Sequence, residues 1–162
     1  MKRIYIGYQG VGKSATVRED GRYIDLESSN FKDDDGRRCD KWYVYYVNTA
    51  FDLAEQGHGV FISSHDVIRS RVGQLARVHP EIEVVAIYPS PELRDTWLDR
   101  LADRYRRNPT YKNRAAWLNA LERFDDNIRE IESDVARYGF GSIVIRTVDY
   151  RLSDLLKTRR QS

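Results

Sequence analysis

The segment Gly7-Tyr8-Gln9-Gly10-Val11-Gly12-Lys13-Ser14 fits the phosphate-binding pattern G-x-x-x-x-G-K-[ST] at every fixed position, and we call it the glycine loop (residues 7–14). It follows Arg3-Ile4-Tyr5-Ile6, a short β-branched and aromatic run that predicts a buried strand. Glycines allow such a loop to surround an anion with its N–H groups, and the helix that follows directs its positive end at the same anion. The pattern therefore predicts a site for a nucleoside triphosphate.

Two side chains of the glycine loop have chemical roles in this prediction. We expect Lys13 to face solvent until it neutralises β- and γ-phosphate oxygens, and the Ser14 hydroxyl to bind Mg²⁺. The residues expected to contact the nucleotide are Gly7, Gln9, Gly10, Val11, Gly12, Lys13, Ser14 and Ala15. The competing interpretation, a glycine-rich turn with a chance lysine, is disfavoured by the complete match.

Length and composition fit one domain over residues 1–162. Hydrophobic residues make up 41% of the chain and charged residues 32%, as in globular proteins. A net charge of +2 is too mild to identify a nucleic-acid-binding protein. No apolar run reaches the length of a membrane span and Met1-Lys2-Arg3 leads straight into the first strand, so we expect neither a membrane segment nor a signal peptide. A single cysteine, Cys39, excludes an internal disulfide and fits a cytoplasmic protein.

Apolar strands and amphipathic helices alternate along the chain. We expect strands at residues 3–6, 22–26, 59–64, 83–88 and 142–147. We expect helices at residues 13–19, 42–56, 66–79, 91–107, 110–138 and 153–160, with a break at Asn108-Pro109. Continuous apolar strands separated by helices predict an α/β fold with a parallel sheet covered on both faces.

This layout resembles the P-loop kinases of small molecules, which include nucleoside, nucleoside monophosphate and shikimate-type kinases. The resemblance covers the whole chain, but only the glycine loop matches residue by residue. It implies a P-loop NTPase fold with strand order 2-3-1-4-5, a helical Arg-rich lid at residues 97–114, and phosphoryl transfer from ATP with Mg²⁺. Two features depart from the family: the first helix is short, and no acidic residue lies inside the third strand.

Ligands of open α/β sheets bind at the carboxyl ends of the strands, so polar residues there are the next candidates. Asp25 ends the second strand, where a carboxylate of the resembled kinases contacts the acceptor hydroxyl or Mg²⁺. We favour Asp25 as the group that orients the acceptor oxygen and takes its proton, over a plain strand end in solvent. Glu27 is equally open to either interpretation. Ser28 and Ser29 either bind the substrate or cap a turn.

The third strand leads into Ser63-Ser64-His65-Asp66. Asp66 either caps the next helix or binds Mg²⁺ through water, in place of the missing strand acid. His65 is a candidate hydrogen-bonding group for the substrate, and a metal role is disfavoured because the chain has no Cys/His cluster. Arg69 either contacts a substrate phosphate or pairs with Asp66 along the helix.

Residues 100–114 carry six basic side chains against one acid, Asp103. Arg100, Arg104 and Arg107 recur at i, i+4 and i+7 and so share one helix face. Guanidinium groups bind phosphate oxygens bidentately, and a lid that carries them can stabilise the charge of a moving phosphoryl group. We expect Arg100 and Arg104 to be catalytic, with Arg104 also contacting the nucleotide. The alternative is a solvated helix face.

A polar loop at residues 32–40 lies where the resembled kinases admit their acceptor. Phe31 and Trp42 flank it, and they either stack on a nucleobase or belong to the core. Residues 33–36 are interpreted as a solvated turn, and because they lack EF-hand spacing we do not predict a calcium site there. The basic residues that can meet an acceptor phosphate are Lys32, Arg37 and Arg38.

Three functions remain open at this point. The first is transfer of the ATP γ-phosphate to a nucleoside, nucleotide or nucleotide-like acceptor. The second is phosphorylation of a hydroxymethylated pyrimidine base in DNA, as in phage-type kinases of similar layout, with the basic loop and lid guiding the phosphate backbone. The third is a non-enzymatic ATP-binding switch or assembly protein, which the lid arginines disfavour.

Overall fold

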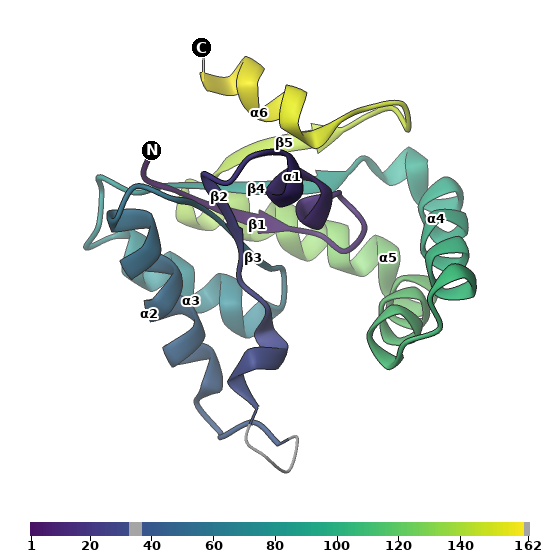
Figure 1. Ribbon diagram of the computed structural model, residues 1–162, viewed down its shortest axis with the longest axis horizontal. Helices are drawn as coiled ribbons and strands as arrows, with labels where there is room; N and C mark the ends of the chain where they lie inside the picture. The colour runs from purple at the N-terminus through teal and green to yellow at the C-terminus, as the bar shows by residue number, and fades with distance from the viewer. Residues whose placement is uncertain (33–36, 161–162) are drawn as a thin grey trace.

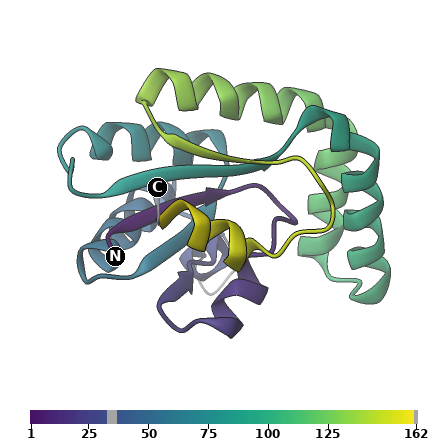
Figure 2. The same cartoon turned by 90° about the horizontal axis from the view of Figure 1, so that it is seen from above.

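The computed structural model describes residues 1–32 and 37–160, so residues 33–36 and the prediction made for them lie outside the described part. Within it, five parallel strands form one sheet (Figures 1 and 2). The strands are β1 (Arg3–Gly7), β2 (Tyr23–Asp25), β3 (Gly59–Ser63), β4 (Glu83–Pro89) and β5 (Gly141–Ile145). Their order across the sheet is β2-β3-β1-β4-β5, which is the 2-3-1-4-5 order that the resemblance implies. The predicted α/β class with a five-stranded parallel sheet is confirmed.

Helices cover both faces of this sheet. The helices of the described residues are α1 (Lys13–Glu19), α2 (Trp42–Glu55), α3 (Asp66–Ala76), α4 (Arg94–Arg107), α5 (Tyr111–Tyr138) and α6 (Leu152–Arg160). Figure 1 shows α2 and α3 below the sheet and α6 above it. None of the helices in residues 1–32 and 37–160 combines the length and the apolar character that a membrane crossing requires.

The central strand β1 is buried on both faces. Ile4 and Ile6 pack with apolar residues of α2 and α3, whereas Tyr5 points to the opposite face and packs with Tyr23 and Phe61. All three β1 side chains are at most 1% exposed. This double burial explains why the run is continuously apolar and does not alternate with polar residues.

The register of the strands brings their carboxyl ends together. Gly7 at the end of β1 is opposite Ser63 at the end of β3. Asp25 at the end of β2 is opposite Phe61, two residues before the end of β3. The glycine loop therefore begins beside the end of β3, and the end of β2, which carries Asp25, lies one strand further along the same edge of the sheet.

Element boundaries differ from the sequence prediction by a few residues. α3 ends at Ala76 and not at residue 79, and α4 begins at Arg94 because Pro91–Leu93 form a separate 3₁₀ turn, η2. A second 3₁₀ turn, η1 (Ser28–Phe31), follows β2. The break between α4 and α5 is confirmed, and the Thr110 side chain caps α5 by accepting from the Asn113 backbone N–H at 3.1 Å.

The predicted lid at residues 97–114 is not one unit. Trp97 and Leu101 of α4 are 0% and 1% exposed and belong to the core that contains Tyr8 and Val11 of the glycine loop. The first half of the predicted lid is therefore fixed to the body of the protein. The end of α4, the turn at residues 108–110 and the start of α5 line the cleft beside the loop.

α5 bends in its middle. Arg123 has φ −134° and ψ 15°, values outside the helical range, and the two halves of α5 run in different directions (Figures 1 and 2). The first half packs against α4 and the second half passes α3. Neither proline nor glycine lies at the bend, so the sequence carried no sign of it.

Candidate functional site

The glycine loop turns at two residues whose conformation favours glycine. Gly10 has φ +85° and Gly12 has φ +104°, both in the left-handed region. Gly7 is required for a different reason, because an added Cβ there would lie 2.8 Å from Lys13 Cδ. The Lys13 amine donates a hydrogen bond to the Gly7 carbonyl at 3.2 Å. The loop thus holds its lysine folded back over its first residue.

The expectation that Lys13 faces solvent is wrong. Its side chain is half-buried, and desolvation lowers the pKa of its amine, an effect that the nearby carboxylates of Asp25 and Glu27 oppose. The two carboxylates favour the charged form that binding to phosphate requires.

Three side chains hold the carbonyl side of the glycine loop, and we call them the carbonyl clamp (Trp97, Arg100 and Tyr150). Each donates a hydrogen bond to one of three successive loop carbonyls. The bonds run from Trp97 Nε1 to Gln9 O (2.8 Å), from Arg100 Nη1 to Gly10 O (3.2 Å) and from the Tyr150 hydroxyl to Val11 O (3.0 Å). With these carbonyls fixed, the loop keeps one shape without a ligand.

The clamp gives Arg100, which also lines the cleft, partners that the sequence did not predict. Its guanidinium also donates to the Tyr150 hydroxyl at 2.9 Å and to Val148 O at 3.3 Å, and it lies 4.4 Å from the centre of the Trp97 ring. These contacts engage Arg100 on the carbonyl side of the loop. We therefore treat it as a positioning residue, not as a catalytic one.

Ser14 and Asp25 meet at the start of α1. The Ser14 hydroxyl donates to Asp25 Oδ2 at 3.2 Å. A hydroxyl and a carboxylate are the hard oxygen ligands that Mg²⁺ prefers, so this pair fits the predicted ion. Asp66, the other predicted ligand, is the first residue of α3, and its Oδ1 accepts from the Val67 backbone N–H at 2.8 Å. The cap position itself belongs to His65, one residue earlier than predicted.

Arg104 approaches the loop from the end of α4. Its Nε donates to Asn113 Oδ1 at 2.8 Å, and Asn113 Nδ2 donates in turn to Asn108 O at 2.9 Å. Desolvation lowers the pKa of Arg104, and the charge of Glu27 opposes this shift. The terminal nitrogens of Arg104 make no hydrogen bond within residues 1–32 and 37–160, so they remain for a ligand. Arg107 lines the same cleft.

An ion pair joins the two sides of the cleft beside Arg104. Lys112 Nζ, at the start of α5, lies 2.5 Å from Glu27 Oε2, just after β2. Sequence reasoning left Glu27 open and gave Lys112 no partner. The pair links the projecting corner of α4 and α5 to the strand end that carries Asp25.

The end of β3 supplies Ser63, Ser64 and His65 to the cleft, as predicted. The Tyr46 hydroxyl accepts from the Ser63 backbone N–H at 2.9 Å and donates to Leu26 O at 2.6 Å, which ties the ends of β2 and β3 together. Desolvation and, secondarily, the charge of Arg38 lower the pKa of His65. The lowered pKa favours the neutral ring, which can both donate and accept a hydrogen bond.

Arg69 has other partners than those predicted. It is 5% exposed, and its Nε lies 2.7 Å from Asp134 Oδ2 of α5, while Nη1 donates to Ser64 O. Glu130 of α5 lies 3.7 Å from its Nη2. The guanidinium thus fastens the β3 end to α5, which leaves little of it for a substrate phosphate, and Asp66 is not its partner.

Phe31 and Trp42 do not line the cleft. Both pack against Tyr46, with ring centroids 5.2 Å and 5.7 Å from its ring, and Trp42 also lies under the Arg38 guanidinium at 4.2 Å. The predicted stacking on a nucleobase is therefore wrong for these two rings, because they cover the second apolar face of the core.

The predicted substrate-binding serines do reach the cleft. Ser28 and Ser29 line it, and Arg38 Nη2 donates to Ser28 Oγ at 3.2 Å. Lys32 and Arg38 also line it, whereas Arg37 does not.

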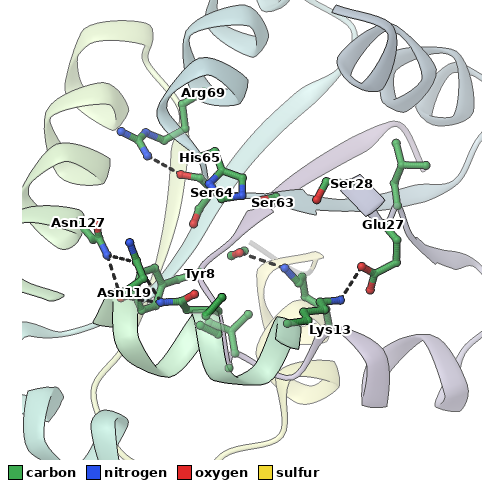
Figure 3. Close-up of a pocket in the computed structure, with 18 of the residues that line it drawn as sticks. Tyr8, Lys13, Glu27, Ser28, Ser63, Ser64, His65, Arg69, Asn119 and Asn127 are labelled. Atoms are coloured by element: carbon green, nitrogen blue, oxygen red, sulfur yellow. Dashed lines mark hydrogen bonds and ion pairs between the residues drawn. The ribbon is translucent and has the colours of Figure 1, made fainter. Parts of the chain in front are cut away.

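The glycine loop, the ends of β2 and β3, and the residues named above as lining residues open on one cleft at the carboxyl ends of the strands, with a volume of 2160 Å³ (Figure 3). Its described lining contains thirteen Lys and Arg side chains against six Asp and Glu, a formal charge of +7, while the whole chain carries +2. Typical small-molecule pockets hold about 300–1,000 Å³. The cleft therefore has room and charge for a ligand with several phosphates.

One part of the cleft was missed by sequence reasoning. Tyr8, Gln9, Asn119 and Asn127 join through their side chains beside the glycine loop, and we call them the amide cluster (Figure 3). Gln9 was predicted only as a nucleotide contact. The two asparagines lie 110 or more positions further along the chain, and no local pattern marks them.

No family model matches this chain, and a search of curated protein sequences found no match either. The function is therefore inferred from the chemistry of the site itself.

Proposed function

We propose that this chain is a P-loop kinase that transfers the γ-phosphate of ATP to a hydroxyl of a nucleoside, nucleotide or nucleotide-like acceptor. The observation that carries the proposal is the contact of Ser14 with Asp25 at 3.2 Å, beside the half-buried Lys13. A glycine loop alone is sufficient to bind phosphate. A loop hydroxyl in contact with a carboxylate from the adjacent β2 end adds the oxygen ligands that phosphoryl transfer uses, and this favours catalysis over binding alone.

In the proposed transfer, the acceptor oxygen forms a bond to the γ-phosphorus as the bond from that phosphorus to the β–γ bridging oxygen breaks. ADP leaves with the electron pair. The acceptor proton passes to Asp25, whose Oδ1 is not engaged by Ser14. Lys13 and Arg104 place positive charge beside the phosphate oxygens as the phosphoryl group moves. Mg²⁺ held by Ser14 and Asp25 would neutralise part of the phosphate charge.

A second candidate function is phosphorylation of a base within DNA. It is favoured by the size of the cleft and by its formal charge of +7, which exceed what one nucleoside triphosphate needs. The third candidate, an ATP-binding switch, is disfavoured by Arg104. Its terminal nitrogens face the cleft unbonded within the described residues, an arrangement suited to a moving charge.

The test of the proposal is the variant Lys13→Ala. Transfer of radiolabelled γ-phosphate is measured on a panel of nucleosides, nucleotides and DNA containing hydroxymethylated pyrimidines, and thermal unfolding is measured in parallel. We expect Lys13→Ala to lose transfer while remaining folded, because the amine contacts only the Gly7 carbonyl among the described residues. Lys157→Ala, on α6 outside the cleft, is the matched control and should keep full activity. Normal transfer by folded Lys13→Ala protein would contradict the kinase assignment.

A further inference from the structure

The four side chains of the amide cluster form one hydrogen-bonded group. Asn119 Oδ1 accepts from Gln9 Nε2 at 3.2 Å and from Asn127 Nδ2 at 2.8 Å. The Tyr8 hydroxyl accepts from the same two amide nitrogens, at 3.4 Å and 3.2 Å. These bonds fix the orientation of every member before any ligand arrives.

The bend in α5 assembles this cluster. Asn119 and Asn127 are eight residues apart, which in a straight α-helix separates them by about 12 Å along the axis. Two short Asn side chains cannot span that distance. Their direct bond exists because the helix departs from regular geometry at Arg123, midway between them. A long helix is thus interrupted at the place where the cluster faces the cleft.

The internal bonds leave a defined set of groups for a ligand. Within the described residues, the Asn119 amide N–H₂ and the Tyr8 O–H donate to nothing, and Gln9 Oε1 and Asn127 Oδ1 accept from nothing. The cluster therefore offers donors and acceptors side by side, all uncharged. Carboxamides in this arrangement complement a ring that presents C=O and N–H on one edge.

The charges beside the cluster are balanced. Arg69 is paired with Asp134 at 2.7 Å, and Arg123 is paired with Glu130 at 2.8 Å. These two guanidinium groups are therefore engaged by carboxylates, whereas Arg71 and Arg137, which also line the cleft, make no ion pair among the described residues. The lining elsewhere is strongly basic.

We propose that the amide cluster is the recognition site for the acceptor, and that it binds the amide or imide edge of a nucleobase-like ring. The proposal rests on the kinase function proposed above and specifies its acceptor. The cluster lies on the glycine loop itself and opens on the same cavity as Ser63, Ser64 and His65 (Figure 3). The ring is held there by uncharged groups while the basic parts of the cleft bind phosphates.

The test compares two ligands that differ at one atom of this edge. Protein loaded with Mg²⁺ and a non-hydrolysable ATP analogue is titrated calorimetrically with thymidine and with N3-methylthymidine. Methylation replaces the imide N–H by a methyl group, which removes the donor and blocks this edge of the ring while leaving the sugar and the rest of the ring unchanged. We expect N3-methylthymidine to bind roughly 10- to 100-fold more weakly, the range for loss of a paired base contact. Equal affinity for both, or binding of neither, would overturn the proposal.

A variant tests whether thymidine binds at the amide cluster. Asn119→Asp replaces the free amide donor by a carboxylate at the same size, and we expect thymidine affinity to fall by about 5- to 150-fold. Asn48→Asp makes the same change on an exposed position of α2 outside the cleft and is the matched control. If Asn119→Asp binds thymidine as the control does, the amide cluster is not the site.

Two further measurements complete the test. One distinguishes a free nucleoside from a base within DNA, and the other distinguishes failure of the acceptor site from failure of the kinase function. A short thymidine oligonucleotide that binds more tightly than the free nucleoside, with the same sensitivity to N3-methylation, identifies a base within DNA. Equal affinity identifies a free nucleoside. Affinity for the ATP analogue is measured in the same samples. If the wild-type protein does not bind the analogue, the kinase function itself is overturned. If it binds the analogue but not thymidine, only the acceptor site is overturned.

Discussion

The two halves of the cleft are held by different kinds of contact. On the donor half, the carbonyl clamp fixes backbone carbonyls, and the loop N–H groups that this leaves are the predicted ligands of phosphate. On the acceptor half, side chains of the amide cluster bind one another and leave side-chain atoms for the ligand. A site built from backbone requires a local motif of glycines. A site built from side chains requires only that distant residues meet.

The first way to break this comparison is at Asp25, which contacts Ser14 on the donor half. We expect Asp25→Asn to lower kcat by about 10²-fold or more, the scale of general-base catalysis, because the amide still contacts Ser14 but takes no proton. The KM for ATP should change much less than kcat, because the Asn amide oxygen can still bind Mg²⁺ together with Ser14. Steady-state transfer at saturating ATP measures both quantities.

Glu27→Gln is the matched change for Asp25→Asn. It removes the ion pair with Lys112 and leaves the Ser14 contact intact, so only a few-fold loss is expected. A larger loss in Glu27→Gln than in Asp25→Asn would show that the base is Glu27.

Arg104 provides a second test, on the donor half. We expect Arg104→Ala to reduce turnover roughly 30- to 300-fold, within the range for lost charge stabilisation, because Lys13 remains in place. ATP affinity measured by calorimetry should fall much less, since the guanidinium acts mainly on the moving phosphoryl group. Arg106→Ala, a 71% exposed position on the same helix outside the cleft, is the control. If Arg104→Ala weakened ATP binding as much as turnover, the residue would serve binding alone and the switch hypothesis would gain.

The same difference explains what could be predicted from the sequence. The strands, the glycine loop and the helix break at residues 108–109 depend on local periodicity and on glycine or proline, and the structure has them close to where they were expected. Asp25 and Ser14 were placed correctly because strand ends converge in a parallel sheet. Ser14 and Asp25 contact each other because of the arrangement of the strands, and not because of their spacing in the sequence.

Long-range packing determined the rest. Arg69 was expected either to contact a substrate phosphate or to pair with Asp66 on its own helix, but it pairs with Asp134, 65 positions away. Arg100 was expected to share a helix face and a catalytic role with Arg104. Because Trp97 is buried, the part of α4 that carries Arg100 lies against the glycine loop. The bend at Arg123, which assembles the amide cluster, has no local sequence cause. Such features depend on which surfaces meet, and periodicity carries no information about that.

The smallest expected effect tests whether the clamp prepares the loop for ATP. Tyr150→Phe removes the hydroxyl that donates to Val11 O at 3.0 Å and accepts from Arg100, while keeping the ring that stacks with Trp97. One neutral hydrogen bond contributes about 0.5–1.5 kcal/mol, so we expect the KM for ATP to rise about 2- to 10-fold with kcat nearly unchanged. Tyr45→Phe, at a 62% exposed position, is the control. A fall in the midpoint of thermal unfolding with no change in KM would mean that Tyr150 only stabilises the fold. A rise in KM without a matching loss of stability would show that the three carbonyls must be held for the loop to bind phosphate.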